Sequence, residues 1–173
     1  MRHSDDNIYS LNLPYPPIIV EKKNPKYIPL LLQNYSGMVS EFTAVSQYVY
    51  HKFRLFGNNR KVADTISGIA MVEMHHLAIL GELITQLGGD PKYWINRKNK
   101  MYYWDGKFVD YGSNLKEFLT YDIQAEVAAI RQYKETIVKI SDKNIVNILE
   151  RIILDEELHL RLFKELYQEF VNE

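Results

Sequence analysis

Two helical patterns in this sequence each contain a glutamate followed three residues later by a histidine, and both groups fall on the apolar face. When residues 62–87 and 145–170 are written in alternating steps of three and four, the two faces match position by position. Each face has three apolar residues, then Glu, then His, then three more apolar residues. Because ionised glutamate is almost never buried without a partner, the fold must bring these groups together with something that compensates their charge. The four polar residues are Glu73, His76, Glu156 and His159.

Two further helical patterns each carry one glutamate near the middle of the apolar face. These are Glu41 and Glu126, and a tyrosine follows each of them seven residues later on the same face, at Tyr48 and Tyr133. Glu41 precedes the first Glu-x-x-His by 32 residues, and Glu126 precedes the second by 30. The chain therefore repeats one scheme twice. Antiparallel helix pairs would bring all six groups to the middle of a bundle.

The same periodicity predicts an all-α fold, a four-helix bundle preceded by an extended arm. Prolines in residues 1–24 disfavour helix there, and residues 25–173 form the bundle. Residues 92–112 are rich in aromatic and basic side chains and form one long crossover connection between the second and third helices, with parts of it extended. The helices are expected at 26–56, 59–87, 113–140 and 141–173.

Composition excludes several classes of function. The 173 residues are 46% hydrophobic, which suits one domain, and 21 basic side chains balance 22 acidic ones, which argues against a nucleic-acid partner. The sequence contains no cysteine, so thiolate nucleophiles, disulfides and iron–sulfur clusters held by cysteine are excluded. By inspection no apolar run reaches the length of a membrane span, and the first twenty residues do not resemble a signal peptide. We therefore expect no membrane partner and a cytoplasmic location.

Four carboxylates inside an apolar bundle need compensating positive charge. Burying each of them as an ion costs several kcal/mol, and their mutual repulsion adds to that cost. Two divalent cations would neutralise four glutamates, and two neutral imidazoles would complete the coordination. An oxygen-rich set with one nitrogen per metal favours two iron or two manganese ions, with zinc as a possible substitute. The six expected ligands are Glu41, Glu73, His76, Glu126, Glu156 and His159.

The sequence resembles the ferritin-like superfamily, specifically its bacterioferritin and rubrerythrin branch, over roughly residues 28–170. The matching segments are SEFTAVSQY around Glu41, EMHH from Glu73, YDIQAEVAAIRQY around Glu126 and DEELH, which contains Glu156. The resemblance implies a ferritin-like bundle with two metals bridged by Glu73 and Glu156. One metal would be bound by Glu41, Glu73 and His76, and the other by Glu126, Glu156 and His159.

The resemblance also implies roles for three further residues. Tyr48 matches a tyrosine beside the site, which could donate a proton or an electron to the oxidant. Asp122 matches an acid that orients a ligating imidazole. Met74 matches a methionine that ligates haem between two subunits in bacterioferritins, although methionine on an outer face more often packs in a dimer interface. Two features depart from the pattern: Ala129 stands where rubrerythrins have a glutamate, and the long aromatic loop is similar to that of manganese catalases.

Three functions are compatible with such a chain. The leading expectation is a di-iron oxidoreductase that reduces peroxide or dioxygen, with peroxidase or ferroxidase chemistry and an external electron donor. The alternative is a di-manganese catalase that disproportionates hydrogen peroxide without a reductant. The third is iron storage, or a structural bundle with a vestigial site. We expect a homo-oligomer, most simply a dimer.

Overall fold

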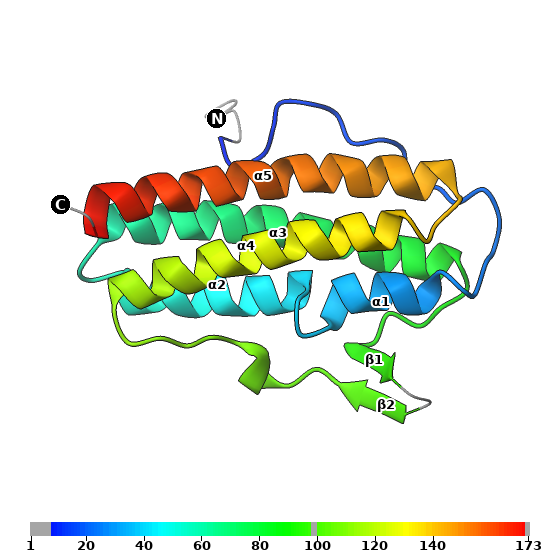
Figure 1. The fold of residues 1–173 in the computed structure, drawn as a ribbon, viewed down its shortest axis with the longest axis horizontal. Helices are drawn as coiled ribbons and strands as arrows, with labels where there is room; N and C mark the ends of the chain where they lie inside the picture. The colour runs from blue at the N-terminus through cyan, green and yellow to red at the C-terminus, as the bar shows by residue number, and fades with distance from the viewer. Residues whose placement is uncertain (1–7, 98–99, 172–173) are drawn as a thin grey trace, which may run out of the picture.

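The computed structural model describes residues 8–97 and 100–171, and in that part of the chain four long helical segments pack side by side (Figure 1). The predicted four-helix bundle is therefore confirmed. The first segment consists of two helices, and the other three are continuous. The helices are α1 (Ile28–Ser36), α2 (Glu41–Leu55), α3 (Arg60–Gln86), α4 (Leu115–Ile137) and α5 (Lys143–Val171).

The predicted crossover connects α3 to α4, which run in the same direction, whereas α2–α3 and α4–α5 are antiparallel pairs joined by short links (Figure 1). The crossover begins with a hairpin of β1 (Trp94–Arg97) and β2 (Lys100–Tyr103), followed by a 3-10 turn at Gly106–Phe108. Its aromatic side chains pack on the first helical segment: Tyr93 stacks on Phe42 with ring centroids 4.0 Å apart. The expectation of extended parts in this loop is also confirmed.

The expected helix at 26–56 is wrong in one respect, because it is interrupted between Ser36 and Glu41. A Cβ on Gly37 would lie 2.5 Å from the carbonyl oxygen of Gln33, so only glycine fits this turn. Ser40 then caps a new helix by accepting a hydrogen bond from the Thr43 amide at 3.2 Å. The interruption turns Met38 outward, with 61% of its surface exposed, although the periodicity assigned it to the apolar face.

The third helical segment, α4, begins at Leu115, two residues later than expected. Asn114 is the N-cap of α4, because its side chain accepts from the Glu117 amide at 3.0 Å. Ser113 instead donates its amide and its hydroxyl to Glu117 Oε2, both at 2.8 Å. The Glu117 carboxylate thus closes the turn that leads from the crossover into α4.

The apolar core forms two clusters that lie toward opposite ends of the bundle. One includes Leu80 and Leu83 of α3 with Leu149 and Ile152 of α5. The other includes Ile66 and Ile69 of α3 with Phe163 and Leu166 of α5. On both helices the Glu-x-x-His segment lies between the two clusters, so each imidazole and each acid has apolar packing above and below it.

The N-terminal segment crosses the outside of α5, as Figure 1 shows. Its described part, residues 8–27, contains neither helix nor strand, in agreement with its proline content. Gln86 of α3 holds it at one end, since its amide donates to the Ile18 carbonyl at 2.7 Å and its oxygen accepts from the Val20 amide at 3.2 Å. Residues 1–7 of the predicted arm lie outside the described residues.

Among the described helices, α3 alone is long and apolar enough to cross a membrane by length and composition. However, 56% of its most apolar stretch is buried inside the bundle. Central helices of globular bundles have the same length and hydropathy, and α3 carries two of the predicted ligands at its middle.

Candidate metal centre

The six predicted ligands come from four helices and are all buried. Glu41 is the first residue of α2, where the positive end of the helix dipole stabilises a carboxylate. Glu126 lies in the middle of α4, and each Glu-x-x-His pair lies in the middle of its helix, α3 or α5. The i, i+3 spacing puts the acid and the imidazole of each pair on adjacent turns of one face.

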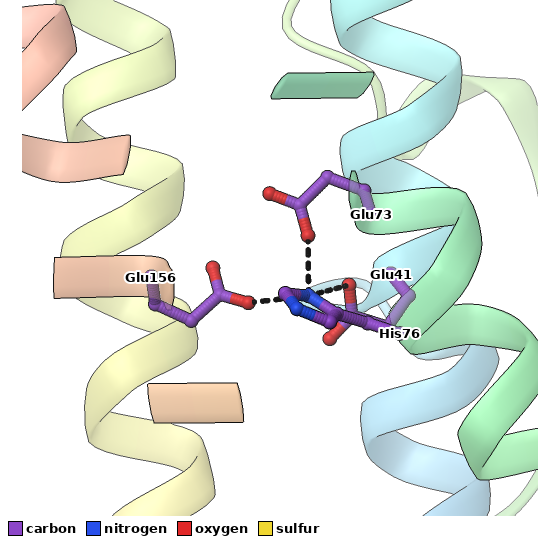
Figure 2. A group of neighbouring side chains, drawn as sticks. All are labelled: Glu41, Glu73, His76 and Glu156. Atoms are coloured by element: carbon purple, nitrogen blue, oxygen red, sulfur yellow. Dashed lines mark hydrogen bonds and ion pairs between the residues drawn. The ribbon is translucent and has the colours of Figure 1, made fainter. Parts of the chain in front are cut away.

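The first group of side chains surrounds the imidazole of His76 (Figure 2). His76 Nδ1 lies 3.0 Å from Glu73 Oε2, 3.0 Å from Glu156 Oε1 and 3.7 Å from Glu41 Oε2. These four side chains each offer one ligand atom, and the atoms all lie within 4.8 Å of one another. Such an arrangement could hold one metal ion.

The second group surrounds the imidazole of His159. His159 Nδ1 lies 2.8 Å from Glu73 Oε1, 3.9 Å from Glu126 Oε1 and 4.0 Å from Glu156 Oε2. Glu73 and Glu156 belong to both groups, and each turns one oxygen toward each imidazole. This is the geometry that a carboxylate needs to bridge two metals.

Several ligand atoms lack hydrogen-bond partners, which tests whether the residues fit a pair of metals. Among the described residues, the buried side-chain atoms without a partner include Glu73 Oε1, Glu126 Oε2, Glu156 Oε1 and His159 Nδ1. Glu73 Oε1 and His159 Nδ1 are 2.8 Å apart and yet do not form a hydrogen bond. Buried polar atoms are normally paired, so these orphaned atoms favour a cation between them. The six side chains form a buried dinuclear carboxylate and histidine metal site.

The close packing of four buried glutamates also shifts their pKa values. Burial, reinforced by the charge of Glu73, raises the pKa of Glu41 to about 8 and that of Glu156 to about 8. Burial, with the charges of Glu156 and Glu73, raises the pKa of Glu126 well above its ordinary value. Burial alone would also raise the pKa of Glu73, but the two imidazoles hold it below its ordinary range. Without metals, Glu73 is therefore the one of the four site glutamates that keeps its charge.

The pKa values of the two imidazoles are also raised, although burial opposes their charged form. Burial alone would lower the pKa of His76, but hydrogen bonds to Asp155 and the site carboxylates raise it well above its ordinary value. Burial likewise opposes the charged form of His159, and the neighbouring charge of Glu73 raises its pKa. Metal ions would therefore displace protons from both imidazoles and from three of the acids.

Tyrosine hydroxyls cross the bundle to the two outer glutamates. Tyr48 of α2 donates to Glu126 Oε1 of α4 at 2.5 Å, and Tyr133 of α4 donates to Glu41 Oε1 of α2. Burial, together with the adjacent carboxylates, raises the pKa of both phenols well above the ordinary value, so both remain donors. The sequence indicated that these tyrosines lie near the site but did not indicate that each bonds the glutamate of the other helix.

Asp122 does not orient a ligating imidazole, and that prediction is wrong. Its Oδ1 accepts from Gln47 Nε2 at 2.9 Å and lies 2.8 Å from Nδ1 of His51, two turns beyond the site. Both partners also bond residue 110 of the crossover: the Asp110 amide donates to Gln47 Oε1 at 3.1 Å, and the Asp110 carbonyl is 2.9 Å from His51 Nε2. The Asp122 network therefore attaches the crossover to the bundle.

Asp155 performs the role that was expected of Asp122. Its Oδ2 lies 3.3 Å from Nε2 of His76, and its Oδ1 forms a 2.8 Å ion pair with Arg151. Burial alone would raise the pKa of Asp155, but its bonds to His76, Tyr15 and Arg151 hold it below its ordinary range. The signal available in the sequence was an acid directly before Glu156 with an arginine four residues earlier, a spacing that allows an ion pair on a helix.

A cavity of about 320 Å³ reaches the site between α2 and α4. Its inner end is formed by Glu41, Glu126 and Glu156, and the 3-10 turn of the crossover contributes Lys107 and Phe108. The interruption between α1 and α2 forms another part of the wall, and small side chains of α4 keep the space open. The lining includes Met38, Val39, Ala44, Ala125, Ala128 and Ala129.

Comparison with known proteins identifies the family. A rubrerythrin family model matches residues 36–167, three quarters of the chain. The chain belongs to the rubrerythrin family. The probable manganese catalase of Clostridium acetobutylicum is 24% identical to it over 174 residues, which cover 89% of this chain and 76% of that protein.

Solved structures confirm the ferritin-like fold of this rubrerythrin-family protein. KatB, a manganese catalase from Anabaena PCC7120, superposes with a TM-score of 0.81 at 21% identity, covering 98% of this chain and 80% of KatB. The bacterioferritin of Desulfovibrio desulfuricans gives a TM-score of 0.71 at 24% identity, covering 86% and 82%. Both likenesses bear on the fold, which the sequence predicted correctly.

Met74 lies outside the dinuclear centre of this rubrerythrin-family chain. It is 46% exposed on the outer surface of α3, together with Met71 one turn before it. Its position agrees with a methionine on an outer face, and haem ligation by Met74 stays a prediction.

Proposed function

We propose that this protein is a di-manganese catalase, which converts two molecules of hydrogen peroxide into two molecules of water and one of dioxygen. The observation that carries the proposal is two buried carboxylate and histidine groups, which share Glu73 and Glu156, at the end of a cavity with small apolar walls. The proposal is further supported by the probable manganese catalase of Clostridium acetobutylicum, which matches most of the chain. It replaces the di-iron oxidoreductase as the leading function.

The reaction balances without a further reductant. One peroxide loses two electrons and two protons to become dioxygen, and the other takes up two electrons and two protons to become two waters. A pair of bound manganese ions would store the two electrons between these half-reactions. The chain itself has no cysteine, so it offers no thiol as an alternative two-electron store.

The side chains around the cavity can bind peroxide and handle its protons. Peroxide carries two hydroxyl donors, and carboxylate oxygens of Glu41, Glu126 and Glu156 line the inner end of the cavity as acceptors. Tyr48 and Tyr133 also line it, and their hydrogen bonds fix two of these carboxylates. Apolar walls limit the water that accompanies the oxidant, which strengthens electrostatic interactions inside.

A metal exchange experiment tests the proposal. We would load metal-free protein with two equivalents of Mn(II) or Fe(II), add hydrogen peroxide without a reductant, and follow dioxygen with an electrode. The manganese form should release one dioxygen for every two peroxides over many turnovers. The Glu73→Gln variant, which loses a bridging carboxylate, is the matched control and should be inactive. A fully loaded manganese form that releases no dioxygen would rule the function out.

A second candidate is the di-iron oxidoreductase, which reduces peroxide or dioxygen with electrons from an external donor. It is favoured by the two complete Glu-x-x-His pairs and by the likeness to a bacterioferritin. In that case the Fe(II) form should consume one peroxide per pair of ferrous ions and then stop until a reductant is supplied. Peroxide consumption that depends on added reductant, with an inert manganese form, would favour this candidate.

A further inference from the structure

The outer nitrogens of both imidazoles are bonded to one segment of the N-terminal arm. His159 Nε2, on α5, lies 2.8 Å from the carbonyl oxygen of Tyr9, and His76 Nε2, on α3, lies 3.0 Å from the hydroxyl of Tyr15. We propose that residues 9–15, the arm segment, are part of the metal centre. In this proposal Tyr9 and Tyr15 are positioning residues that orient both imidazoles, so docking of the arm segment and retention of metal are coupled.

The hydrogen bonds select one tautomer for both rings. A carbonyl oxygen can only accept, so His159 must carry its proton on Nε2 when the ring is neutral. Tyr15 donates its own proton to Asp155 Oδ2, which leaves its oxygen to accept from Nε2 of His76. When the rings are neutral, both therefore turn a lone pair on Nδ1 toward the carboxylates, as metal binding requires.

The arm segment docks on a charge pair built into α5. Asp155 Oδ1 accepts from the Leu11 amide at 2.8 Å, and Asp155 Oδ2 accepts from the Ser10 hydroxyl at 3.0 Å. Arg151 donates to the carbonyl oxygens of Leu11 and Leu13, at 2.8 and 3.0 Å. Since Asp155 directly precedes Glu156 and contacts His76, the residue that anchors the arm segment also touches the metal centre.

The third helix makes room for the arm segment. A Cβ built on Gly68 of α3 would lie only 2.1 Å from the ring of Tyr9, so any other residue there would displace that ring. Glycine within a helix is destabilising, and here the close approach of the Tyr9 ring explains why glycine occupies position 68. Gly68→Ala would therefore disturb the Tyr9 contact without removing any hydrogen-bonding group.

Linkage makes the coupling measurable in both directions. If the docked arm segment favours metal binding, bound metal must favour docking by the same factor. The arm has internal controls: the amides of Val20 and Glu21 bond Gln86 and Asp142, which do not contact the imidazoles. The Leu11 amide, which bonds Asp155, should respond to metal more than these two.

The first experiment is hydrogen exchange on the unmodified protein, with and without two equivalents of Zn(II) or Mn(II). Coupling predicts that metal slows exchange of the Leu11 amide about tenfold, within the usual range of coupling factors, and leaves Val20 and Glu21 nearly unchanged. Equal protection of all three amides, or none, in a fully loaded sample would contradict the proposal. This test needs no variant, so folding defects cannot obscure it.

The second experiment measures Mn(II) release to a chelator from Tyr15→Phe, Gly68→Ala and a matched control, Tyr27→Phe. The Tyr27 hydroxyl also takes part in a tertiary hydrogen bond, which it accepts from the Ser141 amide, and Ser141 is not one of the site residues. We expect Tyr15→Phe and Gly68→Ala to release metal about tenfold faster than wild type, and Tyr27→Phe to match wild type. Equal release rates for Tyr15→Phe and Tyr27→Phe would overturn the inference.

The inference rests on the dinuclear centre and not on the reaction, because neither experiment measures turnover. Metal-dependent protection of Leu11 in a protein that releases no dioxygen would refute the catalase function alone. A catalase whose metals leave at the same rate in all variants would refute only the role of the arm segment.

Discussion

The hydroxyl of Tyr48 on α2 donates to Glu126 Oε1 on α4 at 2.5 Å. Its counterpart runs the other way, since Tyr133 on α4 donates to Glu41 on α2. Each tyrosine follows the glutamate of its own helix by seven residues but bonds the glutamate of the opposite helix. The two hydrogen bonds join α2 and α4 on the face where the cavity opens, and each fixes one of the two non-bridging glutamates.

Tyr48→Phe should weaken one of the two metal-binding events. Glu126 would lose the donor on Oε1, and its Oε2 already lacks a partner in the described part of the chain. Loss of such a supporting bond typically reduces metal affinity about tenfold. Titration calorimetry with Mn(II) would separate the two events, and Tyr133→Phe, which affects Glu41, is the mirror-image control. Two unchanged affinities in Tyr48→Phe would show that the bond does not support the metal.

The sequence was sufficient to predict the bundle and the grouping of the six site residues, because both depend on periodicity. An acid at position 73 or 156 interrupts an otherwise apolar face, and helix geometry alone brings it to the level of its counterpart. The interruption at residues 37–40 could also have been predicted, since Gly37 and the Ser40 cap are local signals. The prediction of one continuous helix over 26–56 followed the long apolar periodicity and did not use these local signals.

The surroundings of the imidazoles could not be predicted in the same way. Tyr15 and Asp155 are 140 residues apart, and their contact depends on how an irregular segment crosses α5. Irregular backbone has no periodicity from which to infer its partners. Asp122 was misassigned for a related reason: it lies on the correct face of its helix, but the buried His51 is nearer to it than either ligating imidazole.

Glu73→Gln should destabilise the metal-free protein far more than Glu156→Gln. Glu73 remains ionised between two imidazoles whose pKa values are raised, so its loss leaves buried positive charge unpaired, at a cost of about 3 kcal/mol. The pKa of Glu156 is raised to about 8, so at pH 7 a neutral amide replaces a mostly neutral acid, at a cost of about 1 kcal/mol or less. Urea unfolding of both metal-free variants at pH 7 would measure the difference. Equal losses would mean that the two acids share the charge.

Metal binding should release protons and strengthen as pH rises. Glu41 and Glu156 have pKa values of about 8, and the pKa of Glu126 is higher than its ordinary value, so near pH 7 these ligands are largely protonated and must ionise to bind metal. Calorimetry of Mn(II) binding in buffers of different ionisation enthalpy would count the released protons. We expect more than one per protein at pH 7, and an affinity that increases from pH 6 to pH 9. An affinity independent of pH in that interval would contradict the assigned protonation states.

The metal-free protein should lose thermal stability as pH rises, whereas the metal-loaded protein should not. The folded pKa values of Glu41 and Glu156, about 8, exceed the ordinary value of 4.5, so their contribution is complete below pH 4.5 and is lost as pH rises through 8. The raised pKa values of the two imidazoles act in the same direction above pH 6.5. Glu73 and Asp155, whose pKa values are lowered, act oppositely, and their contribution is lost at acidic pH. Thermal unfolding of the metal-free and metal-loaded proteins from pH 5.5 to 9 would test this prediction. A Tm of the metal-free protein that rises over this range would contradict the predicted loss of stability.

Ala129→Leu should block the reaction without removing the metals. Ala129 lies on α4 one turn after Glu126 and lines the cavity, so three added carbons would fill space beside the site while leaving all six site residues in position. We expect full Mn(II) stoichiometry and at least a tenfold loss of dioxygen release, because displacement of an approaching reactant by about 1 Å can cost a factor of 100. Ala78→Leu, at an exposed position of α3, adds the same side chain away from the cavity and should retain activity. If Ala129→Leu and Ala78→Leu release dioxygen equally fast, peroxide does not reach the metals between α2 and α4.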